Sequence, residues 1–240
     1  MERTVMAFPV KPGATAEQVD SVSAMFRSRP EEYRESRRRT GVSLERAYHQ
    51  PTPMGDFVVV YLETEGSAAE AMGKGAASEL SIDQDFVRLV NEVHGIDVTA
   101  PTAGPPPETV GVWTDPDATA RGRGLAFCAP LMPGVEDAGR AFAREAFETR
   151  RDEMSASRRA FDETVEVVTL QATPHGSIIC VYLEGADPAG SNRSFAASDA
   201  PFDVWFKGQL ATLFPPQIDF NQPIPPVQEL FDSETMPAGA

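Results

Sequence analysis

The chain has 240 residues and a formal net charge of −15, with 36 Asp and Glu against 21 Lys and Arg. A charge of this sign repels phosphate backbones and anionic lipid surfaces, so we expect neither nucleic acid nor a membrane as a partner. Hydrophobic residues make up 41% of the sequence, and no apolar run approaches the roughly 18 residues of a membrane-spanning helix. The sequence therefore indicates a globular protein of the cytoplasm.

A tandem repeat organises the sequence. Residues 36–63 recur as residues 157–184 at a constant offset of 121 residues, without a gap. The shared letters are Ser-Arg-Arg at the start, Gln-x-Thr-Pro-x-Gly in the middle and Val-Tyr-Leu-Glu at the end. Each half is long enough to form its own hydrophobic core. We therefore predict two domains, residues 1–115 and 116–240, each with a C-terminal arm.

The first half is predicted to contain, in chain order, a strand, a long helix, a strand hairpin, two helical stretches and a short last strand. Their expected residues are 5–8, 15–41, 44–50 with 57–63, 67–77 with 85–94, and 96–98. Pro30 should interrupt the long helix, because proline has no backbone N–H to donate. This order, β-α-β-β-α-β, is typical of the ferredoxin-like arrangement.

Each half ends in a proline-led segment that finishes on an apolar and an aromatic residue. These segments are residues 107–113, which end in Val112-Trp113, and residues 225–231, which end in Leu230-Phe231. An aromatic side chain on a disordered tail would forgo its burial. We therefore expect each arm to pack back onto its own half or across onto the other half, the alternative being a flexible tail.

The second half is predicted to repeat the order of the first. Its expected elements are a strand at 125–129, a helix from 135 to about 160, a hairpin over 165–184, a helix that starts near Pro201, and a short strand at 218–220. Arg151 stands where the first half has Pro30, so we expect the first helix of this half to run unbroken. Cys128 and Cys180 lie in predicted strands without metal-ligand spacing, and we expect two buried free thiols.

The third strand of the first half is apolar on both of its faces. Val58, Val60 and Leu62 share one side, and Phe57, Val59, Tyr61 and Glu63 alternate with them on the other. A sheet that is apolar on both faces needs two covering layers. Helices cover one face in this arrangement, so we predict that the second faces of the two sheets pack against each other.

The hairpin pattern, followed by Pro-Phe-Asp-x-Trp-Phe at 201–206 and an Ile-Asp strand, is similar to a group of uncharacterised bacterial proteins in the dimeric α+β barrel superfamily. The resemblance implies the fold class α+β, with two tandem ferredoxin-like (βαββαβ) units packed sheet to sheet as a pseudo-dimeric α+β barrel. The superfamily includes cofactor-independent monooxygenases, lactone isomerases, haem enzymes and ligand-sensing domains, so it implies no single reaction. The first half offers residues 82–86 in place of 201–206, so the halves need not bind alike.

Two tyrosine and glutamate pairs are the first candidates for chemistry. Tyr61 with Glu63, and Tyr182 with Glu184, should line the space between the sheets. A buried carboxyl beside a phenol can act as a general acid/base pair. The alternative is that the tyrosines are core residues and the glutamates are solvated where the strands end.

His49 is a second candidate base, because it is the one histidine in a predicted strand. The alternative is a hydrogen-bonded or half-exposed residue, which is the commoner situation of a lone histidine in a strand. We assign possible catalytic roles to His49, Glu63 and Glu184, and ligand contacts to an aromatic group that comprises Tyr48, Phe57, Tyr61, Tyr182 and Trp205. The three histidines show no metal-ligand spacing, so we assign no metal and no cofactor.

Three functions fit the sequence. The first is a barrel that binds a small apolar or aromatic molecule between the sheets. The second is a cofactor-independent monooxygenase or isomerase that acts on an enolisable or phenolic small molecule. The third is a purely structural module that serves oligomerisation. We expect a small-molecule ligand as the partner and a monomer or a homodimer as the assembly.

Overall fold

The computed structural model describes residues 1–100 and 105–236 of the chain. Two compact units are present and are described separately. Unit 1 comprises Met1–Pro106 together with Val227–Ala240, and unit 2 comprises Pro107–Pro226. Among the described residues, no helix combines the length and the apolar character that crossing a membrane requires.

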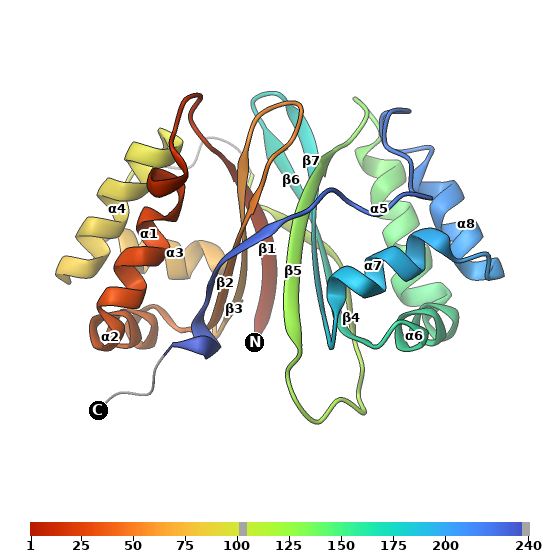
Figure 1. Cartoon of the computed structure of the whole chain (residues 1–240), viewed down its shortest axis with the longest axis horizontal. Helices are drawn as coiled ribbons and strands as arrows, with labels where there is room; N and C mark the ends of the chain where they lie inside the picture. The colour runs from red at the N-terminus through yellow and green to blue at the C-terminus, as the bar shows by residue number, and fades with distance from the viewer. Residues whose placement is uncertain (101–104, 237–240) are drawn as a thin grey trace. The chain divides into compact units, whose positions relative to one another are not determined.

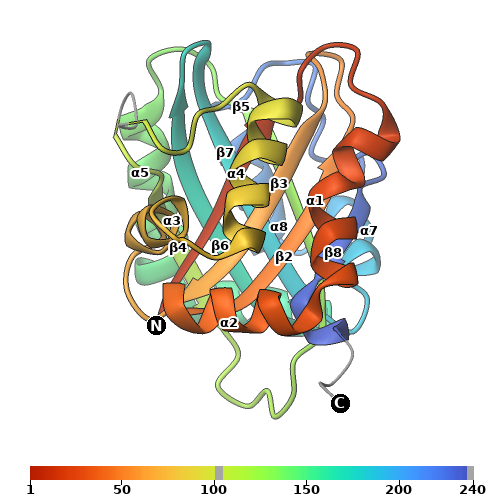
Figure 2. The same ribbon diagram turned by 90° about the vertical axis from the view of Figure 1, so that its left-hand side faces the viewer.

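Unit 1 has an antiparallel sheet in the order β1-β3-β2-β8, with its helices on one face (Figure 1). Figure 2 shows this helical face in front of the sheet. The elements are β1 (Glu2–Pro9), α1 (Ala16–Ser28), α2 (Pro30–Thr40), β2 (Val42–Gln50), β3 (Phe57–Thr64), α3 (Ala68–Ala76), α4 (Ser81–His94), β8 (Gln228–Asp232) and the 3₁₀ turn η2 (Ser233–Thr235).

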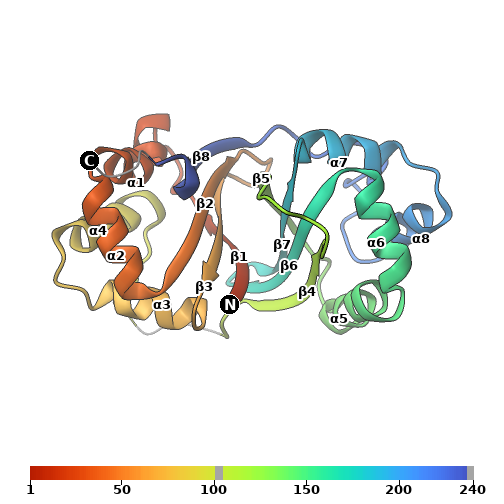
Figure 3. The same cartoon turned by 90° about the horizontal axis from the view of Figure 1, so that it is seen from below.

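Unit 2 repeats this plan with the sheet order β4-β6-β7-β5. Its helices also lie on one face of the sheet (Figure 3). The elements are β4 (Glu108–Thr114), β5 (Arg123–Pro130), α5 (Glu136–Arg144), the π-helical segment η1 (Glu145–Thr149), α6 (Arg151–Ala160), β6 (Glu163–Thr173), β7 (Gly176–Gly185), α7 (Pro188–Ala197) and α8 (Pro201–Leu210). The predicted fold class, α+β with two tandem ferredoxin-like units, is confirmed.

The two arms cross to the other half of the sequence. Strand β4 follows the first repeat but pairs with β6 of unit 2, and β8 follows the second repeat but pairs with β2 of unit 1. The short strands predicted at 96–98 and 218–220 are wrong, because both segments are irregular. Three residues with a central Asp offer little apolar surface to a sheet, and the arms supply the fourth strand of each sheet instead.

The register of the arms differs from the alignment suggested by their sequences. Phe231 lies opposite Ala47 on β2, and Gly111 lies opposite Val168, which is the repeat equivalent of Ala47. Phe231 and Gly111 therefore occupy equivalent positions. A methyl group on Gly111 would stand 2.6 Å from a ring carbon of Phe147, so the ring of Phe147 occupies the space that a side chain would need there.

Both long helices break at equivalent residues. The backbone leaves helical geometry at Arg29, with φ −130° and ψ 56°, and at Arg150, with φ −104° and ψ 31°. The prediction of an unbroken helix from 135 to about 160 is wrong, because this break does not depend on Pro30. At this break Arg150 lies over the ring of Trp205 of α8, 3.9 Å from its centroid, in a favourable cation–π contact.

Both faces of each sheet are buried. In unit 1, Val58 packs in the helix-side core, whereas Val59 and Tyr61 on the opposite face are also fully buried. The alternation predicted for β3 is therefore confirmed. The prediction that the two sheets cover each other stays a prediction. Cys128 and Cys180 are buried and form no disulfide, as expected.

Candidate functional site

A cavity of about 140 Å³ lies in unit 2 between the sheet and the helices. Strand residues such as Phe127 and Val181 form one wall, and helix residues such as Phe142 and Phe206 form the other. The long helix covers this face because its apolar positions recur at helical spacing. The lining is mostly aliphatic and aromatic, which is the usual character of a small-molecule site.

One part of this lining is charged. Arg158 at the end of α6 donates a short hydrogen bond through Nε to Glu166 of β6 and a 3.0 Å bond to Ser157. Its guanidinium also lies over the ring of Phe206 at 4.9 Å. Arg158 and Glu166 are both buried. A buried ion pair that is fully hydrogen-bonded holds its geometry, because breaking it would leave an unpaired charge.

Glu163 is the third charged residue at this part of the cavity. It begins β6, its side chain is buried, and Arg158 Nε lies 3.6 Å from its Oε2. Among the described residues, no group donates a hydrogen bond to Glu163 Oε2. Burial raises the pKa of Glu163 to about 8, and the charges of Glu166 and Asp203 add to this rise while Arg158 opposes it.

Asp203 on α8 supports the charged cluster from behind. Its Oδ1 accepts a 2.5 Å bond from Ser157, and its Oδ2 accepts a 2.6 Å bond from Ser198. Lys207, one turn further along α8, donates to the carbonyl oxygens of Ala196 and Ser198. These bonds join α6, α7 and α8 and fix the orientation of the arginine.

Unit 1 contains the equivalent cavity, of about 130 Å³. Arg37 donates a 2.7 Å bond to Glu45, as Arg158 does to Glu166. The hydroxyl of Tyr33 also donates to Glu45, at 3.0 Å. Burial, followed by the charge of Glu45, raises the pKa of Tyr33, so the phenol stays a neutral donor. Val42 occupies the position of Glu163 in this cavity.

A further acid lines the unit 1 cavity. Asp83 is the equivalent of Asp203 and accepts a 2.5 Å bond from Ser36. Its second oxygen, Oδ2, has no hydrogen-bond partner among the described residues. Because Asp203 is bonded at both oxygens and Asp83 at one, the halves arrange the same carboxylate differently.

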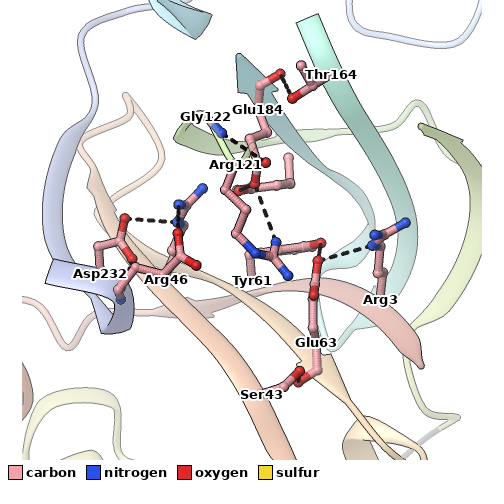
Figure 4. Close-up of polar contacts among 12 residues, drawn as sticks. Arg3, Ser43, Arg46, Tyr61, Glu63, Arg121, Gly122, Thr164, Glu184 and Asp232 are labelled. Atoms are coloured by element: carbon pink, nitrogen blue, oxygen red, sulfur yellow. Dashed lines mark hydrogen bonds and ion pairs between the residues drawn. The ribbon is translucent and has the colours of Figure 1, made fainter. Parts of the chain in front are cut away.

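The two predicted tyrosine and glutamate pairs exist in the structure. Tyr61 donates a 2.8 Å bond to Glu63, which also accepts from Arg3 at 3.1 Å. Tyr182 donates a 2.7 Å bond to Glu184. The glutamates are buried rather than solvated. Figure 4 shows Glu63 with Arg3 and, on the other sheet, Glu184 with Gly122. The catalytic roles of these pairs stay predictions.

The remaining predicted residues are dispersed. His49 on β2 is partly buried and lies 2.9 Å from Asp56 through Nε2. Tyr48, next to it on the same strand, is buried. Phe57 is half-buried at the start of β3, opposite Gln50. The structure therefore does not gather the predicted residues of unit 1 around His49.

Trp205 lies on the helix side of its sheet and not beside Tyr182. It packs on α8 against Phe142 of α5, with ring centroids 5.7 Å apart, and under Arg150. The prediction grouped Trp205 with the inner-face tyrosines, and the structure corrects this placement. The reason is that the apolar face of α8 is buried against α5 rather than against the far face of the sheet.

Glu163 was not singled out from the sequence. It belongs to no motif, and it stands just before the predicted hairpin. The repeat itself could have revealed it, because aligning the two halves places Glu163 at the position of Val42. Within residues 1–100 and 105–236, no three His, Cys, Asp or Glu side chains gather in a way that would hold a metal ion.

Comparisons with known proteins bear on the fold of the chain and do not assign it a function. Residues 1–108, less than half of the chain, match a family of unknown function, DUF6176. Among curated proteins, no sequence matches this chain.

Two solved structures are similar over nearly the whole chain. A candidate monooxygenase from Fusobacterium nucleatum subsp. nucleatum ATCC 25586 has a TM-score of 0.50 and 10% identity, with 96% of this chain and 92% of that chain covered. An anthrone oxidase-like protein has a TM-score of 0.43 and 9% identity, with 95% and 88% covered. The similarity to the first structure agrees with an α+β fold of tandem ferredoxin-like units. At this low identity, a shared fold does not indicate a shared function.

Proposed function

We propose that this protein binds a small, largely apolar molecule in the cavity of unit 2. The observation that carries the proposal is an apolar cavity of about 140 Å³ with one charged cluster in its wall. A cavity of about 150 Å³ lined by Leu, Ile and Phe holds a benzene molecule. A ligand with a single ring therefore matches the volume, and the cluster gives it a fixed orientation.

The intrinsic fluorescence of the protein tests this proposal. Both tryptophans, Trp113 and Trp205, belong to unit 2. Trp205 packs against Phe142 and Phe206, which line the cavity. Titration with toluene should give a saturable change in emission. The absence of a saturable change, both in emission and in the methyl NMR shifts of unit 2, would overturn the proposal.

A matched pair of variants controls the titration. Val181 lines the cavity of unit 2, and Val60, its repeat equivalent, lines that of unit 1. Val181→Phe fills the unit 2 cavity and should abolish the emission change. Val60→Phe makes the same replacement in unit 1 and should leave the change intact. Equal responses of the two variants would show that toluene binds elsewhere.

A second candidate is an enzyme that moves a proton on an enolisable or phenolic substrate. It is supported by the buried carboxyl of Glu163, because a pKa of about 8 suits a general acid or base near neutral pH. The predicted assignments to His49, Glu63 and Glu184 belong to the same candidate. Loss of turnover in Glu163→Gln, or in variants of those three residues, would identify the group that acts; unchanged turnover would exclude each in turn.

A further inference from the structure

The two units differ at the strand position where the charged cluster meets the cavity. Val42 and Glu163 stand at the same place in the repeat, each at the start of a strand, and each lines the cavity of its own unit. The neighbouring arginine and glutamate are the same in both units. The acid is therefore an addition to a shared scaffold and has no counterpart at this position in unit 1.

Glu163 is not needed to balance the arginine. Arg158 already bonds to Glu166 and Ser157, while Glu163 Oε2 lies 3.6 Å from Arg158 Nε. An uncompensated buried acceptor is unfavourable by roughly 1–3 kcal/mol. No described residue supplies the missing donor. Near neutral pH the carboxyl keeps its proton, and with that proton on Oε1 a donor on a bound molecule would satisfy Oε2.

The surroundings of Glu163 restrict what that donor can be. The charged groups that face it are Arg158 on α6, Glu166 on β6 and Asp203 on α8. A ligand carboxylate would meet three acids here, against a single arginine that is already paired. An uncharged hydroxyl meets no such repulsion, and it can donate to Oε2 while its ring contacts Phe206 and Phe142 in the apolar wall.

We propose that unit 2 selects a single-ring phenol, whose hydroxyl donates a hydrogen bond to Glu163 Oε2 while the ring fills the apolar part of the cavity. This inference rests on the proposed binding function and adds the class of ligand and the residue that recognises it. Toluene has nearly the same shape as phenol but lacks the donor. The ratio of the two affinities therefore isolates the contribution of Glu163.

The test measures phenol and toluene binding to the full chain by tryptophan emission, with calorimetry as a second readout. Wild type should bind phenol about tenfold more tightly than toluene, since a satisfied buried acceptor contributes about 1.4 kcal/mol. Glu163→Val places the unit 1 residue in unit 2 and should reverse this preference. Glu163→Gln keeps a carbonyl acceptor and should retain it.

The outcomes separate this inference from the binding function. If toluene binds but phenol binds no more tightly, or if Glu163→Val leaves the ratio unchanged, the phenol assignment is overturned and the binding function stands. If Glu163→Gln loses the preference together with Glu163→Val, the carbonyl acceptor is not what recognises phenol, and the assignment is again overturned. If neither molecule binds to wild type, both proposals fail.

Discussion

The two units are built on one scaffold but satisfy their buried charges differently. In unit 1 the arginine and glutamate pair is supported by the hydroxyl of Tyr33, whereas in unit 2 the equivalent residue is Met154 and a second acid, Glu163, is present. Each cluster keeps one carboxylate oxygen that no described residue satisfies, Asp83 Oδ2 in unit 1 and Glu163 Oε2 in unit 2. The two units therefore share the arginine and glutamate pair and differ in the groups that lie beside it.

Removal of the arginine should have the largest effect and should distinguish the units. Arg158→Met leaves both Glu166 and Glu163 buried without a cation, so unit 2 should lose about 3–5 kcal/mol of its free energy of unfolding. Arg37→Met leaves Glu45 with its hydrogen bond from Tyr33, so unit 1 should lose less.

Hydrogen exchange read on β2 and on β6 separates the two units in this experiment. A loss in unit 1 as large as that in unit 2 would show that Tyr33 does not compensate Glu45, and that the two clusters are equivalent.

The second prediction concerns β4, the arm strand that pairs with β6 in unit 2. Gly111→Ala places a methyl group 2.6 Å from the ring of Phe147, and overpacking of this kind should reduce the free energy of unfolding of unit 2 by about 1–3 kcal/mol. Val112→Ala on the same strand is the control, because Val112 is exposed and should change stability by less than about 0.5 kcal/mol. Urea denaturation followed by tryptophan emission measures both, and equal losses would contradict the close approach at Gly111.

Glu163 should make the stability of unit 2 depend on pH. Its pKa is about 8 in the folded chain and 4.5 when unperturbed, so the folded state keeps a proton that the unfolded state has released between these values. The contribution of Glu163 to the free energy of unfolding is therefore greatest below about pH 4.5. It falls as pH rises toward 8, by up to about 1.4 kcal/mol per pH unit. Glu163→Val should flatten this slope, and a slope identical to that of wild type would assign it to another group.

The caps of equivalent helices should show the smallest effect and no difference between units. Ser67 accepts from the backbone of Glu70 at the start of α3, and Asp187 accepts from Gly190 at the start of α7. Ser67→Ala and Asp187→Ala should each lower stability by about 1 kcal/mol, the usual contribution of an N-cap. Thermal unfolding of the two variants compares them, and a clear inequality would reveal tertiary contacts specific to one cap.

The repeat made the architecture predictable. Features that depend on contacts between residues far apart in the sequence could not be predicted from it. Alternation in residues 57–63 and proline at 201 fix a strand face and a helix start locally, and both were found. The fourth strands were misplaced, because pairing between β2 and β8 joins residues about 180 positions apart and no local pattern encodes it. The helix break at Arg150 was missed, since arginine has good helix propensity and its contacts with Phe202 and Trp205 of α8 are not local in the sequence.

For the candidate site, the sequence predicted the hydrogen-bonded tyrosine and glutamate pairs but not the cavity. The pairs follow from strand alternation, which places residues two apart on one face. The cavity depends on how three helices pack over the sheet, and periodicity does not determine such volumes. The raised pKa of Glu163 results from burial and from the charges of Glu166 and Asp203, and neither its burial nor its proximity to Asp203 on α8 is visible in the strand pattern.

The crossing of the arms has a consequence for synthesis on the ribosome. Unit 2 is contiguous from Pro107 to Pro226, so it can close as soon as that segment emerges. Unit 1 waits for β8, although most of it is translated first, and until then the edge of β2 presents unpaired N–H and C=O groups. The usual N-terminal-first order of maturation is thus inverted, and a truncated translation product that lacks residues 228–232 would carry a strand edge open to other chains.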